Sequence, residues 1–380
     1  MKRVLITGGA GFIGSSLAKR LIDNNYEVTV LDNLAPQIHG ANPGETSPLY
    51  RSIVANRIRF IHGSVTDRDS LIKALHDQDV VVHFAAETGT GQSMYKIWHY
   101  VDVNTGGTAL MLDILANGKY QVKKMIVASS RSIYGEGRYF SRDLNAYVYP
   151  TSRTTADMDK GDFEVKYPGA KSPLELVATD EQSRIHPSSV YGITKQNQEQ
   201  MIMTVCPTIG IAPVAFRYQN VYGPGQSLSN PYTGILSIFS NLINQGKEIN
   251  IFEDGKESRD FVFIDDVVSA TFAGIASDNA NNKVYNVGTG VATDVMTVAK
   301  TLMRHYKKET ALKISGNYRL GDIRHNFADL TRIKEDLGYS PAVNFDQGIK
   351  KFADWVSGQN ATYGGYEESL SEMKSKGLLK

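Results

Sequence analysis

The feature that most constrains the fold is a glycine-rich turn close to the N-terminus. An apolar run at residues 3–7 leads directly into Gly8, Gly11 and Gly14, after which an amphipathic helical pattern begins. Without side chains at Gly8 and Gly11, backbone N–H groups can approach a pyrophosphate at the N-terminus of that helix, and Gly14 allows helix and strand to pack closely. An ordinary tight turn also uses glycine, but it does not require a strand before it and a helix after it. The context therefore predicts a dinucleotide-binding loop.

The chain up to about residue 217 alternates short apolar runs with helical patterns. The run at residues 80–84 has no polar alternation, which is typical of a strand that is covered on both faces. Strands are expected at residues 3–7, 27–31, 58–61, 80–84, 124–128 and 212–216. This alternation predicts an α/β fold with a Rossmann-type doubly wound parallel sheet.

Beyond Tyr218 the predicted elements become shorter and mixed. We expect residues 1–217 to form the dinucleotide-binding Rossmann domain and residues 218–380 to form mainly a smaller mixed α/β substrate lobe, with some segments returning to the first domain. Two proline-rich stretches interrupt the pattern, a surface loop at residues 34–55 and an insertion or lid at residues 136–187. The sequence leaves open the role of the insertion and the order of the tail from about residue 358.

A carboxylate ends the second predicted strand. Asp32 can accept hydrogen bonds from both hydroxyls of a ribose and would repel a 2′-phosphate. Asn33 follows it, and no Arg or Lys adjoins the two residues to hold such a phosphate. The predicted cofactor is therefore NAD rather than NADP.

Three Tyr-x-x-x-Lys matches occur in the chain, and only their context separates them. The pair at 120 and 124 runs into an apolar strand, where residues four apart lie roughly 13 Å from each other. The pair at 167 and 171 encloses a proline and a glycine, which oppose a helix. Tyr191 and Lys195 begin a predicted helix that continues to about residue 204, so their side chains share one face. A nearby ammonium favours the phenolate, which makes Tyr191 the expected general base and Lys195 its partner.

The fifth predicted strand ends in a run of serines. Ser130 lies at the carboxyl edge, where doubly wound sheets bind their ligands, and its hydroxyl could hydrogen-bond a reacting hydroxyl. Serines at strand ends also form turns and caps, so Ser130 is informative only together with Tyr191 and Lys195. We predict these three residues as the catalytic group.

Composition excludes several classes of function. The chain has 41 Lys and Arg against 40 Asp and Glu, so no basic surface for nucleic acid is expected. Its only cysteine, Cys206, excludes a disulfide framework and a cysteine-rich zinc site, and no metal is expected. No stretch of about 18 apolar residues offers a membrane span. We expect a cytoplasmic protein that meets no membrane.

Together these motifs resemble the extended short-chain dehydrogenase/reductase superfamily of NAD-dependent nucleotide-sugar epimerases and dehydratases. The likeness covers nearly the whole chain and keeps the family's order of motifs. They are the glycine loop, Phe84-Ala85-Ala86, Asn104 ahead of Gly107-Thr108, Ser130 ahead of Tyr134-Gly135, Tyr191/Lys195, and the string from Arg217 to Pro224. The resemblance implies the same fold, tightly bound NAD and a nucleotide-sugar substrate.

The full set of site residues includes several that only the resemblance implies. The set for NAD is Gly8, Gly11, Phe12, Ile13, Gly14, Asp32, Asn33, Ser64, Val65, Phe84, Ala85, Ala86, Thr88, Asn104, Tyr191, Lys195, Tyr218, Asn220 and Val221. The set for the substrate is Glu87, Thr88, Ser130, Arg131, Asn220, Arg259, Arg319 and Asp322. The guanidinium groups of Arg259 and Arg319 suit a diphosphate, and Asp322 could accept hydrogen bonds from the nucleotide ribose.

Two residues separate the reactions within this family. Its dehydratases carry an Asp-Glu pair directly after the catalytic hydroxyl residue, whereas this chain has Arg131 and Ser132 there. Water elimination needs such an acid and base, but epimerisation at C4 needs only Tyr191 and NAD. We expect a nucleotide-sugar 4-epimerase that works through a transient 4-keto intermediate. The alternatives are a 4,6-dehydratase, a 4-ketoreductase and a non-catalytic NAD-binding scaffold.

Three strings further resemble the dTDP-L-rhamnose 4-epimerase subgroup, at residues 86–95, 130–137 and 226–234. They imply a dTDP- or UDP-linked hexose or 6-deoxyhexose used in polysaccharide biosynthesis, while the sugar and the base stay open. Some members of this subgroup carry paired cysteines in the insertion, and this chain has none there. The family's dimers pair two helices per subunit, which predicts a homodimer through residues 103–115 and 188–204.

Overall fold

The computed structural model describes residues 2–40, 42–46, 50, 51, 55, 58–228, 230, 234–359 and 365–380. Parts of the expected surface loop at residues 34–55, of the string at 226–234 and of the tail from residue 358 lie outside these residues. Within the described part of the chain, no helix is long and apolar enough to cross a membrane.

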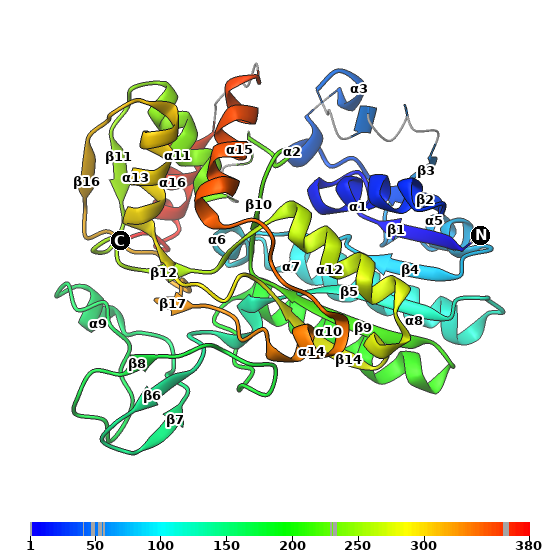
Figure 1. Ribbon diagram of the computed structural model, residues 1–380, viewed down its shortest axis with the longest axis horizontal. Coiled ribbons are helices and arrows are strands. Elements are labelled where there is room, and N and C mark those ends of the chain that lie inside the picture. The colour runs from blue at the N-terminus through cyan, green and yellow to red at the C-terminus, as the bar shows by residue number, and fades with distance from the viewer. Residues whose placement is uncertain are drawn as a thin grey trace.

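Seven parallel strands form the central sheet (Figure 1). They are β1 (Arg3–Thr7), β2 (Glu27–Asp32), β3 (Arg59–His62), β4 (Val80–His83), β5 (Lys124–Ser130), β9 (Ala212–Tyr218) and β14 (Lys283–Val287). Their spatial order is β3-β2-β1-β4-β5-β9-β14, and each neighbouring pair runs parallel. The predicted doubly wound parallel sheet is confirmed. The strand order reverses between β1 and β4, and folds of this kind bind their ligands outside the carboxyl ends of the strands at that point.

Helices cover both faces because the strands are apolar on both sides. Along β1, Val4 and Ile6 face one hydrophobic cluster and Leu5 faces the other, and all three side chains are buried. α1 (Phe12–Asp23) and α12 (Ile264–Ala276) pack on the first face. α5 (Arg68–Leu75), α8 (Gly107–Asn117) and α10 (Val190–Thr208) pack on the second. The sheet is therefore a rigid base for the loops at its carboxyl edge.

Short elements connect the sheet to the site. They are α2 (Pro36–His39), α3 (Pro43–Thr46), α6 (Thr90–Ser93), α7 (Ile97–Tyr100), a π-helical segment (Val101–Gly106) that leads into α8, and a 3₁₀ turn (Arg131–Tyr134) after β5.

The second lobe lies beyond the carboxyl ends of the strands, at the upper left of Figure 1. Its helices α11 (Ile235–Asn244), α13 (Val295–Tyr306) and α15 (Phe345–Ser357) pack together, and α14 (Thr331–Leu337) lies nearer the sheet. Its strands form three small sheets: β10 (Asn220–Tyr222) with β13 (Phe261–Phe263), β11 (Ile249–Ile251) with β16 (Leu312–Ile314), and β12 (Ser258–Arg259) between β15 (Thr293–Asp294) and β17 (His325–Asn326).

Two elements of the C-terminal half lie in the layers of the first domain. β14 pairs with β9 at the edge of the central sheet, and α12 packs against α1. Tyr285 of β14 is buried, with its ring 5.9 Å from that of Phe216 in β9. A division of the chain at residue 217 therefore separates strands that pair with each other.

Residues 136–187, which we call the insertion, form an arm at the lower left of Figure 1. β6 (Tyr139–Ser141) pairs antiparallel with β7 (Ala146–Val148) and β8 (Glu175–Leu176), and the short helix α9 (Thr155–Met158) lies between β7 and β8 in the chain. The buried guanidinium of Arg324 joins this arm to the second lobe, because it pairs with Glu164 of the insertion and with Asp254.

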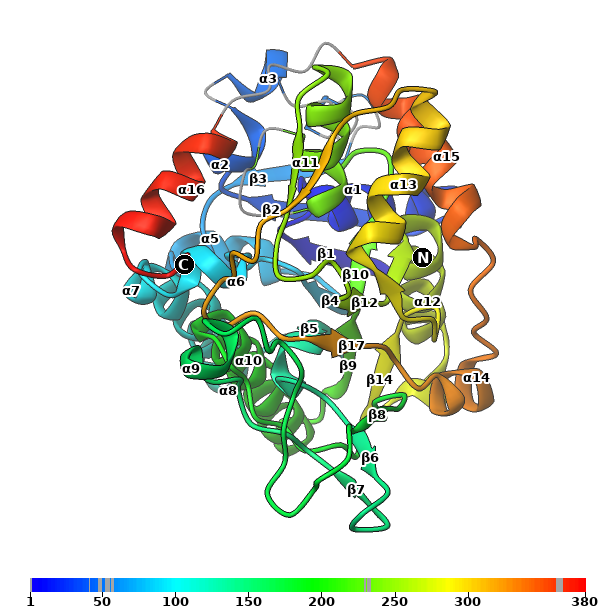
Figure 2. The ribbon, with the colours of Figure 1, turned by 90° about the vertical axis from the view of Figure 1, so that its left-hand side faces the viewer.

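Residues 365–380, which we call the C-terminal tail, form α16 (Tyr366–Ser375) and a short extended end. α16 lies beside α6 in Figure 2, and Met373 on it is buried. This part of the tail, whose order the sequence left open, is packed against the protein.

Candidate active site

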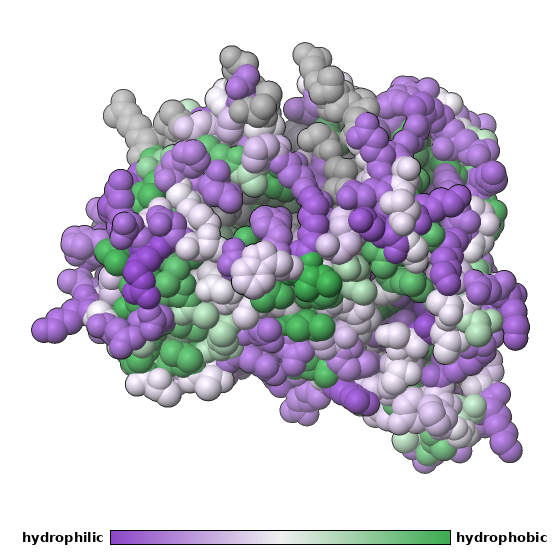
Figure 3. All heavy atoms as spheres, turned by 180° about the vertical axis from the view of Figure 1, so that it is seen from behind, coloured by the Kyte–Doolittle hydropathy of each residue, from purple (hydrophilic) through white to green (hydrophobic). Residues whose placement is uncertain are grey.

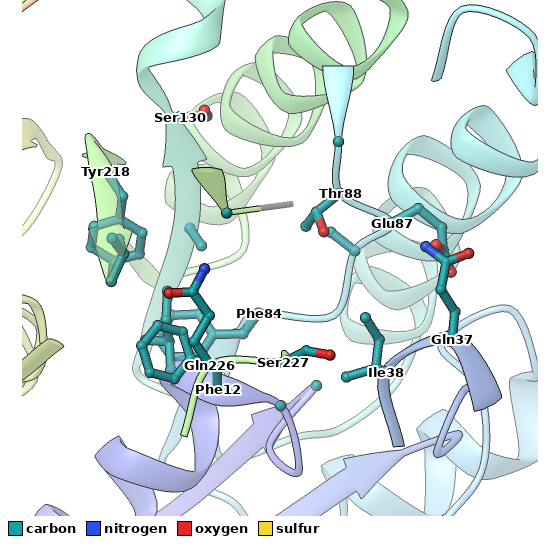
Figure 4. A pocket seen from close by; sticks show the side chains of 18 of the residues that line it. Phe12, Gln37, Ile38, Phe84, Glu87, Thr88, Ser130, Tyr218, Gln226 and Ser227 are labelled. Atoms are coloured by element: carbon teal, nitrogen blue, oxygen red, sulfur yellow. The ribbon is translucent and has the colours of Figure 1, made fainter. Parts of the chain in front are cut away.

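A large cavity lies at the carboxyl edge of the central sheet, between the sheet and the second lobe. Its volume of about 1470 Å³ exceeds the roughly 300–1,000 Å³ of a usual small-molecule pocket. In Figure 4, Phe12, Gln226 and Tyr218 lie on one side of this space, and Glu87 and Thr88 lie on the other. The cavity is large enough for a dinucleotide and a second ligand together.

The glycine loop forms one end of the cavity. Gly8 has a φ of +68°, which side chains rarely adopt, and a Cβ atom there would lie 2.7 Å from the backbone nitrogen of Ala85. A Cβ atom on Gly14 would lie 2.5 Å from the Gly8 oxygen, so the start of the helix is in close contact with the turn that precedes it. No side chain caps the first turn of α1. The N–H groups of this turn and the open cradle beside them fit the pyrophosphate of NAD.

Asp32 is held at the end of β2 by backbone donors. The N–H of Ala10 donates to Oδ2 at 3.0 Å, and the N–H of Leu34 donates to Oδ1 at 2.8 Å. The carboxylate lines the cavity, and His39 Nε2 lies 3.8 Å from Oδ1. Burial lowers the pKa of His39 against the attraction of Asp32, so this ring adds little positive charge at neutral pH. The site is therefore unfavourable for a 2′-phosphate.

We expect Asp32→Ala to weaken NAD binding by roughly 10–100-fold, because the charged hydrogen-bond acceptor for the ribose is removed. Adding Asn33→Arg to this variant should raise the affinity for NADP relative to NAD, because the arginine supplies a partner for the 2′-phosphate. The measurement is the ratio of the two dissociation constants, obtained by titration of cofactor-free protein, with Asn33→Gln as the control. A wild-type preference for NADP would contradict the role that we give to Asp32.

The structure brings the three predicted catalytic residues together. Tyr191 and Lys195 lie in the first turns of α10, and both line the cavity with Ser130. Ser189 caps this helix by accepting the N–H of Gly192 at 3.1 Å. The hydroxyl of Ser130 is close enough to the phenol of Tyr191 to lower its pKa. The side chains of the two other Tyr-x-x-x-Lys pairs do not line this cavity.

The electrostatics of Tyr191 involve Arg131 in addition to the predicted groups. Lys195 is buried, its Nζ donates to the carbonyl of Ala128 at 3.0 Å, and burial lowers its pKa to about 7. Burial raises the pKa of Tyr191, whereas the nearby hydroxyl of Ser130 and the charge of Arg131 lower it. Arg131 is therefore a further cation that favours the phenolate, and the same effect of Lys195 stays a prediction.

Arg131 lies between the part of the cavity that contains Tyr191 and the part that contains Arg259. Its Nε donates to Oδ1 of Asn220 at 2.8 Å. Burial and then the charge of Arg259 lower the pKa of Arg131 to about 9, and Asp322 and Tyr191 oppose this shift. Arg131 is therefore close enough to Tyr191 and to Arg259 to interact electrostatically with both.

The far end of the cavity contains the residues predicted for the nucleotide. Arg259 donates through Nη1 to the carbonyl of Arg324 at 2.9 Å and through Nη2 to that of Ile323 at 2.6 Å. The guanidinium of Arg319 lies over the ring of Phe252 at 5.0 Å, and its Nε lies 3.4 Å from Oδ2 of Asp322. Arg259, Arg319 and Asp322 all line the cavity.

Asn104 is the one residue of the predicted set that does not line this cavity. Its Oδ1 accepts the N–H of Glu87 at 2.7 Å, and its Nδ2 donates to the carbonyl of Glu87 at 3.0 Å and to Thr194 Oγ1 at 2.9 Å. Asn104 is therefore placed to fix the loop after β4 against α10, and the other predicted site residues form the cavity wall.

The sequence missed several residues of the wall. Those with the greatest chemical interest are Arg51, Gln226, Phe252, Glu257 and Trp355. Phe252 directly follows β11, so the strand-end rule that selects Ser130 could also have found it. The other four follow no predicted strand, so only the folded chain reveals them. Among the described residues, no group of three or more His, Cys, Asp or Glu side chains is arranged to hold a metal ion.

Comparison with protein families gives one match that spans most of the chain. Residues 4–156 and 166–288 match the model of the NAD dependent epimerase/dehydratase family. The gap between the two matched ranges falls inside the insertion.

Individual relatives match over nearly their full length. The chain is 35% identical over 358 residues to a dTDP-L-rhamnose 4-epimerase of Burkholderia thailandensis, covering 94% of this chain and 95% of the relative. The UDP-glucose 4-epimerase of Thermotoga maritima, solved with UDP-glucose, is similar with a TM-score of 0.73 and 31% identity over 93% of this chain and 98% of that one. The UDP-glucuronic acid 4-epimerase of Bacillus cereus, solved with UDP-glucuronic acid and NAD, has a TM-score of 0.74 and 26% identity over 93% and 99%.

Proposed function

This chain belongs to the NAD-dependent epimerase/dehydratase family, and we propose that it inverts the configuration at C4 of a nucleotide-linked sugar. One observation carries the proposal: the cavity joins Tyr191, Lys195 and Ser130 with Arg131 in the position where dehydratases have an acid. The wall therefore offers the groups for oxidation and reduction at C4 without the adjacent acid-base pair for water elimination.

NAD would be held by the first domain. The N–H groups at the start of α1 suit its pyrophosphate, Asp32 suits the adenosine ribose, and Lys195 suits the nicotinamide ribose. Bound NAD supplies the acceptor and then the donor of the C4 hydride. Residues of the second lobe, with Arg259 and Arg319, would hold the diphosphate of the sugar nucleotide.

Tyr191 is the proposed acid-base group. Its phenolate takes the proton of the C4 hydroxyl as the carbonyl forms, and its hydroxyl returns the proton when the carbonyl is reduced. Ser130 orients the reacting oxygen, and Arg131 stabilises the phenolate. The arginines at the far end keep the nucleotide anchored while the 4-keto sugar turns over, and the volume of the cavity supports this step.

Two other readings use the same fold. A 4-ketoreductase would use the Tyr191 and Lys195 pair but exchange its dinucleotide in each cycle, so retention of NAD through gel filtration separates it from an epimerase. A non-catalytic NAD-binding scaffold would make both residues dispensable. Lys195 is buried, and Tyr191 and Ser130 line the cavity with it, which favours catalysis.

The substrate that we propose is a dTDP- or UDP-linked hexose or 6-deoxyhexose. The relative with 35% identity is named a dTDP-L-rhamnose 4-epimerase, and the two solved structures above contain UDP-sugars. We also propose a cytoplasmic location, with which the single buried Cys206 agrees.

The proposal predicts a specific isotope result. We expect the NAD-loaded protein to invert C4 of one member of a panel of dTDP- and UDP-sugars, followed by NMR in deuterium oxide. Neither C4 nor C5 should gain deuterium, because the hydride returns from the cofactor that received it and the chain places Arg131 and Ser132 where a base for C5 would be. A Tyr191→Phe sample is the control. Deuterium at C5 would overturn the assignment and implicate Glu87 or Glu257, the latter a cavity residue whose pKa burial raises to about 7.

We further propose a homodimer through the face of the molecule that α8 and α10 cover. These are the helices in the two segments that the resemblance predicts to pair. Ile97 and Trp98 of α7 and Ile193 of α10 expose 51%, 78% and 45% of their surface. Figure 3 shows hydrophobic patches on this side of the molecule. Light scattering at micromolar concentration should give the mass of two chains, and Trp98→Glu should lower it toward one, while Tyr147→Glu on the insertion should not. A wild-type monomer would contradict this arrangement.

A further inference from the structure

Residues 318–322, which we call the Arg319 segment, carry two of the groups proposed to bind the nucleotide. Arg319 and Asp322 line the cavity from this segment, which turns at Gly321 with a φ of +86°. The segment has no long helix or strand of its own. Its geometry must therefore come from the parts of the chain that pack against it.

The C-terminal tail holds one side of the Arg319 segment through backbone hydrogen bonds. The N–H of Tyr318 donates to the carbonyl of Lys380 at 2.9 Å, and the N–H of Lys380 donates back to Tyr318 at 3.0 Å. The N–H of Leu320 donates to the carbonyl of Leu378 at 2.9 Å, and Arg319 and Leu379 form an antiparallel bridge. The end of the chain thus adds an extended strand to the segment.

The tail is itself anchored on the first domain. The hydroxyl of Tyr95 donates to Oε2 of Glu372 at 2.9 Å, and a Cβ atom on Gly91 would lie 3.0 Å from the sulfur of Met373. Gly91 belongs to α6 and lines the cavity. The tail therefore reaches from the loop after β4 to the Arg319 segment of the second lobe.

The insertion contacts the Arg319 segment from the side opposite the tail. Tyr318 is buried with Met158 and Phe163 of the insertion, and Leu320 packs on the same cluster. The hydroxyl of Tyr318 donates to Oδ1 of Asp159 at 2.5 Å. The guanidinium of Arg153, also from the insertion, donates to the carbonyl of Asp322 at 3.1 Å.

We propose that the insertion and the C-terminal tail together position Arg319 and Asp322 for the nucleotide diphosphate of the substrate. In an extended segment, neighbouring side chains point to opposite sides. Because Tyr318 is buried in the insertion cluster and Leu320 packs against it, Arg319 lies on the side of the cavity. Ordering this segment before the substrate arrives removes an entropic cost from binding. The proposal rests on the proposed function only in naming a nucleoside diphosphate as the ligand.

Two small changes test it. A chain that ends at Lys376 lacks the strand at residues 377–380 but keeps α16. Tyr318→Phe keeps the buried ring and removes the bond to Asp159. Tyr147→Phe is the matched control, because it makes the same change on an exposed side chain of the insertion. Binding of UDP and dTDP to the NAD-loaded protein is measured by calorimetry, together with NAD content, melting temperature and, for the substrate found by NMR, kcat and KM.

We expect the shortened chain to bind UDP or dTDP about ten-fold more weakly and Tyr318→Phe to bind it several-fold more weakly, with KM rising in parallel. The kcat and the NAD content should stay near the wild-type values, which a loss of folding would not produce. Variants that bind the nucleotides as tightly as the control, or that lose NAD together with nucleotide, overturn the inference and leave the proposed function intact. A wild-type protein that binds neither nucleotide overturns both.

Discussion

Tyr191→Phe should lower turnover by about 10²–10⁴-fold while the protein keeps its NAD, because the phenol is the only proposed group that moves the C4 proton. The ring that remains fills the same space, so binding of substrate and cofactor should change little. Tyr218 is the other tyrosine that lines the cavity within the described chain, but its hydroxyl is 2.6 Å from Thr271 Oγ1 and burial raises its pKa far above neutral. It cannot replace Tyr191 as a base.

The measurement is the rate of C4 inversion at saturating substrate, with NAD content read from the absorbance of the denatured protein. Tyr167→Phe is the control, because Tyr167 begins another Tyr-x-x-x-Lys pair that lies in the insertion. Near-normal turnover in Tyr191→Phe would reject the mechanism, and so would an equal loss in both variants.

Gly8→Ala should abolish the retention of NAD and destabilise the protein by roughly 2–5 kcal/mol. A methyl group at Gly8 would meet Ala85 N at 2.7 Å, Ala85 Cα at 2.8 Å and the carbonyl carbon of Phe84 at 2.9 Å. All three are backbone atoms of the neighbouring loop, so the contact cannot be relieved by turning a side chain. Any shift of the Gly8 backbone also moves the N–H groups proposed to hold the pyrophosphate.

Gly161→Ala separates the clash from the backbone strain. Gly161 has a similar φ of +77°, but no atom lies within 4 Å of the position of its Cβ. This control should lose only about 1 kcal/mol and keep its NAD. Equal unfolding free energies for the two variants in urea, or NAD retained by Gly8→Ala, would show that the close approach of the glycine loop to Ala85 is not needed.

Local sequence patterns were sufficient to predict the parallel sheet, the glycine loop and the pairing of Tyr191 with Lys195. Gly8, Gly11 and Gly14 all lie between the end of β1 and the first turn of α1. Tyr191 and Lys195 lie four residues apart on one helix. Over such distances the geometry of a helix or a strand end sets which groups are neighbours, so spacing is enough. The parallel sheet could also be predicted from local patterns, because strands that are apolar on both faces need helices on both sides.

Tertiary structure added a charge near Tyr191 that the spacing did not show. Spacing indicated Lys195, whose pKa is lowered by burial and whose ammonium donates to the carbonyl of Ala128. Arg131, which directly follows β5, also lowers the pKa of Tyr191. Desolvation and the distances between groups on different elements decide such effects, and a sequence contains neither.

The sequence by itself determined the glycine loop, the Asp32 strand end, the Tyr191 and Lys195 helix and the parallel sheet, because each depends on residues that are close in the chain. The tertiary structure alone decided that β14 joins the central sheet and α12 packs on α1, that Asn104 holds a loop instead of lining the cavity, and that the insertion and the tail meet at the Arg319 segment. Those contacts join segments far apart in the chain, and they form because the complete fold must bury apolar surface and pair buried polar groups.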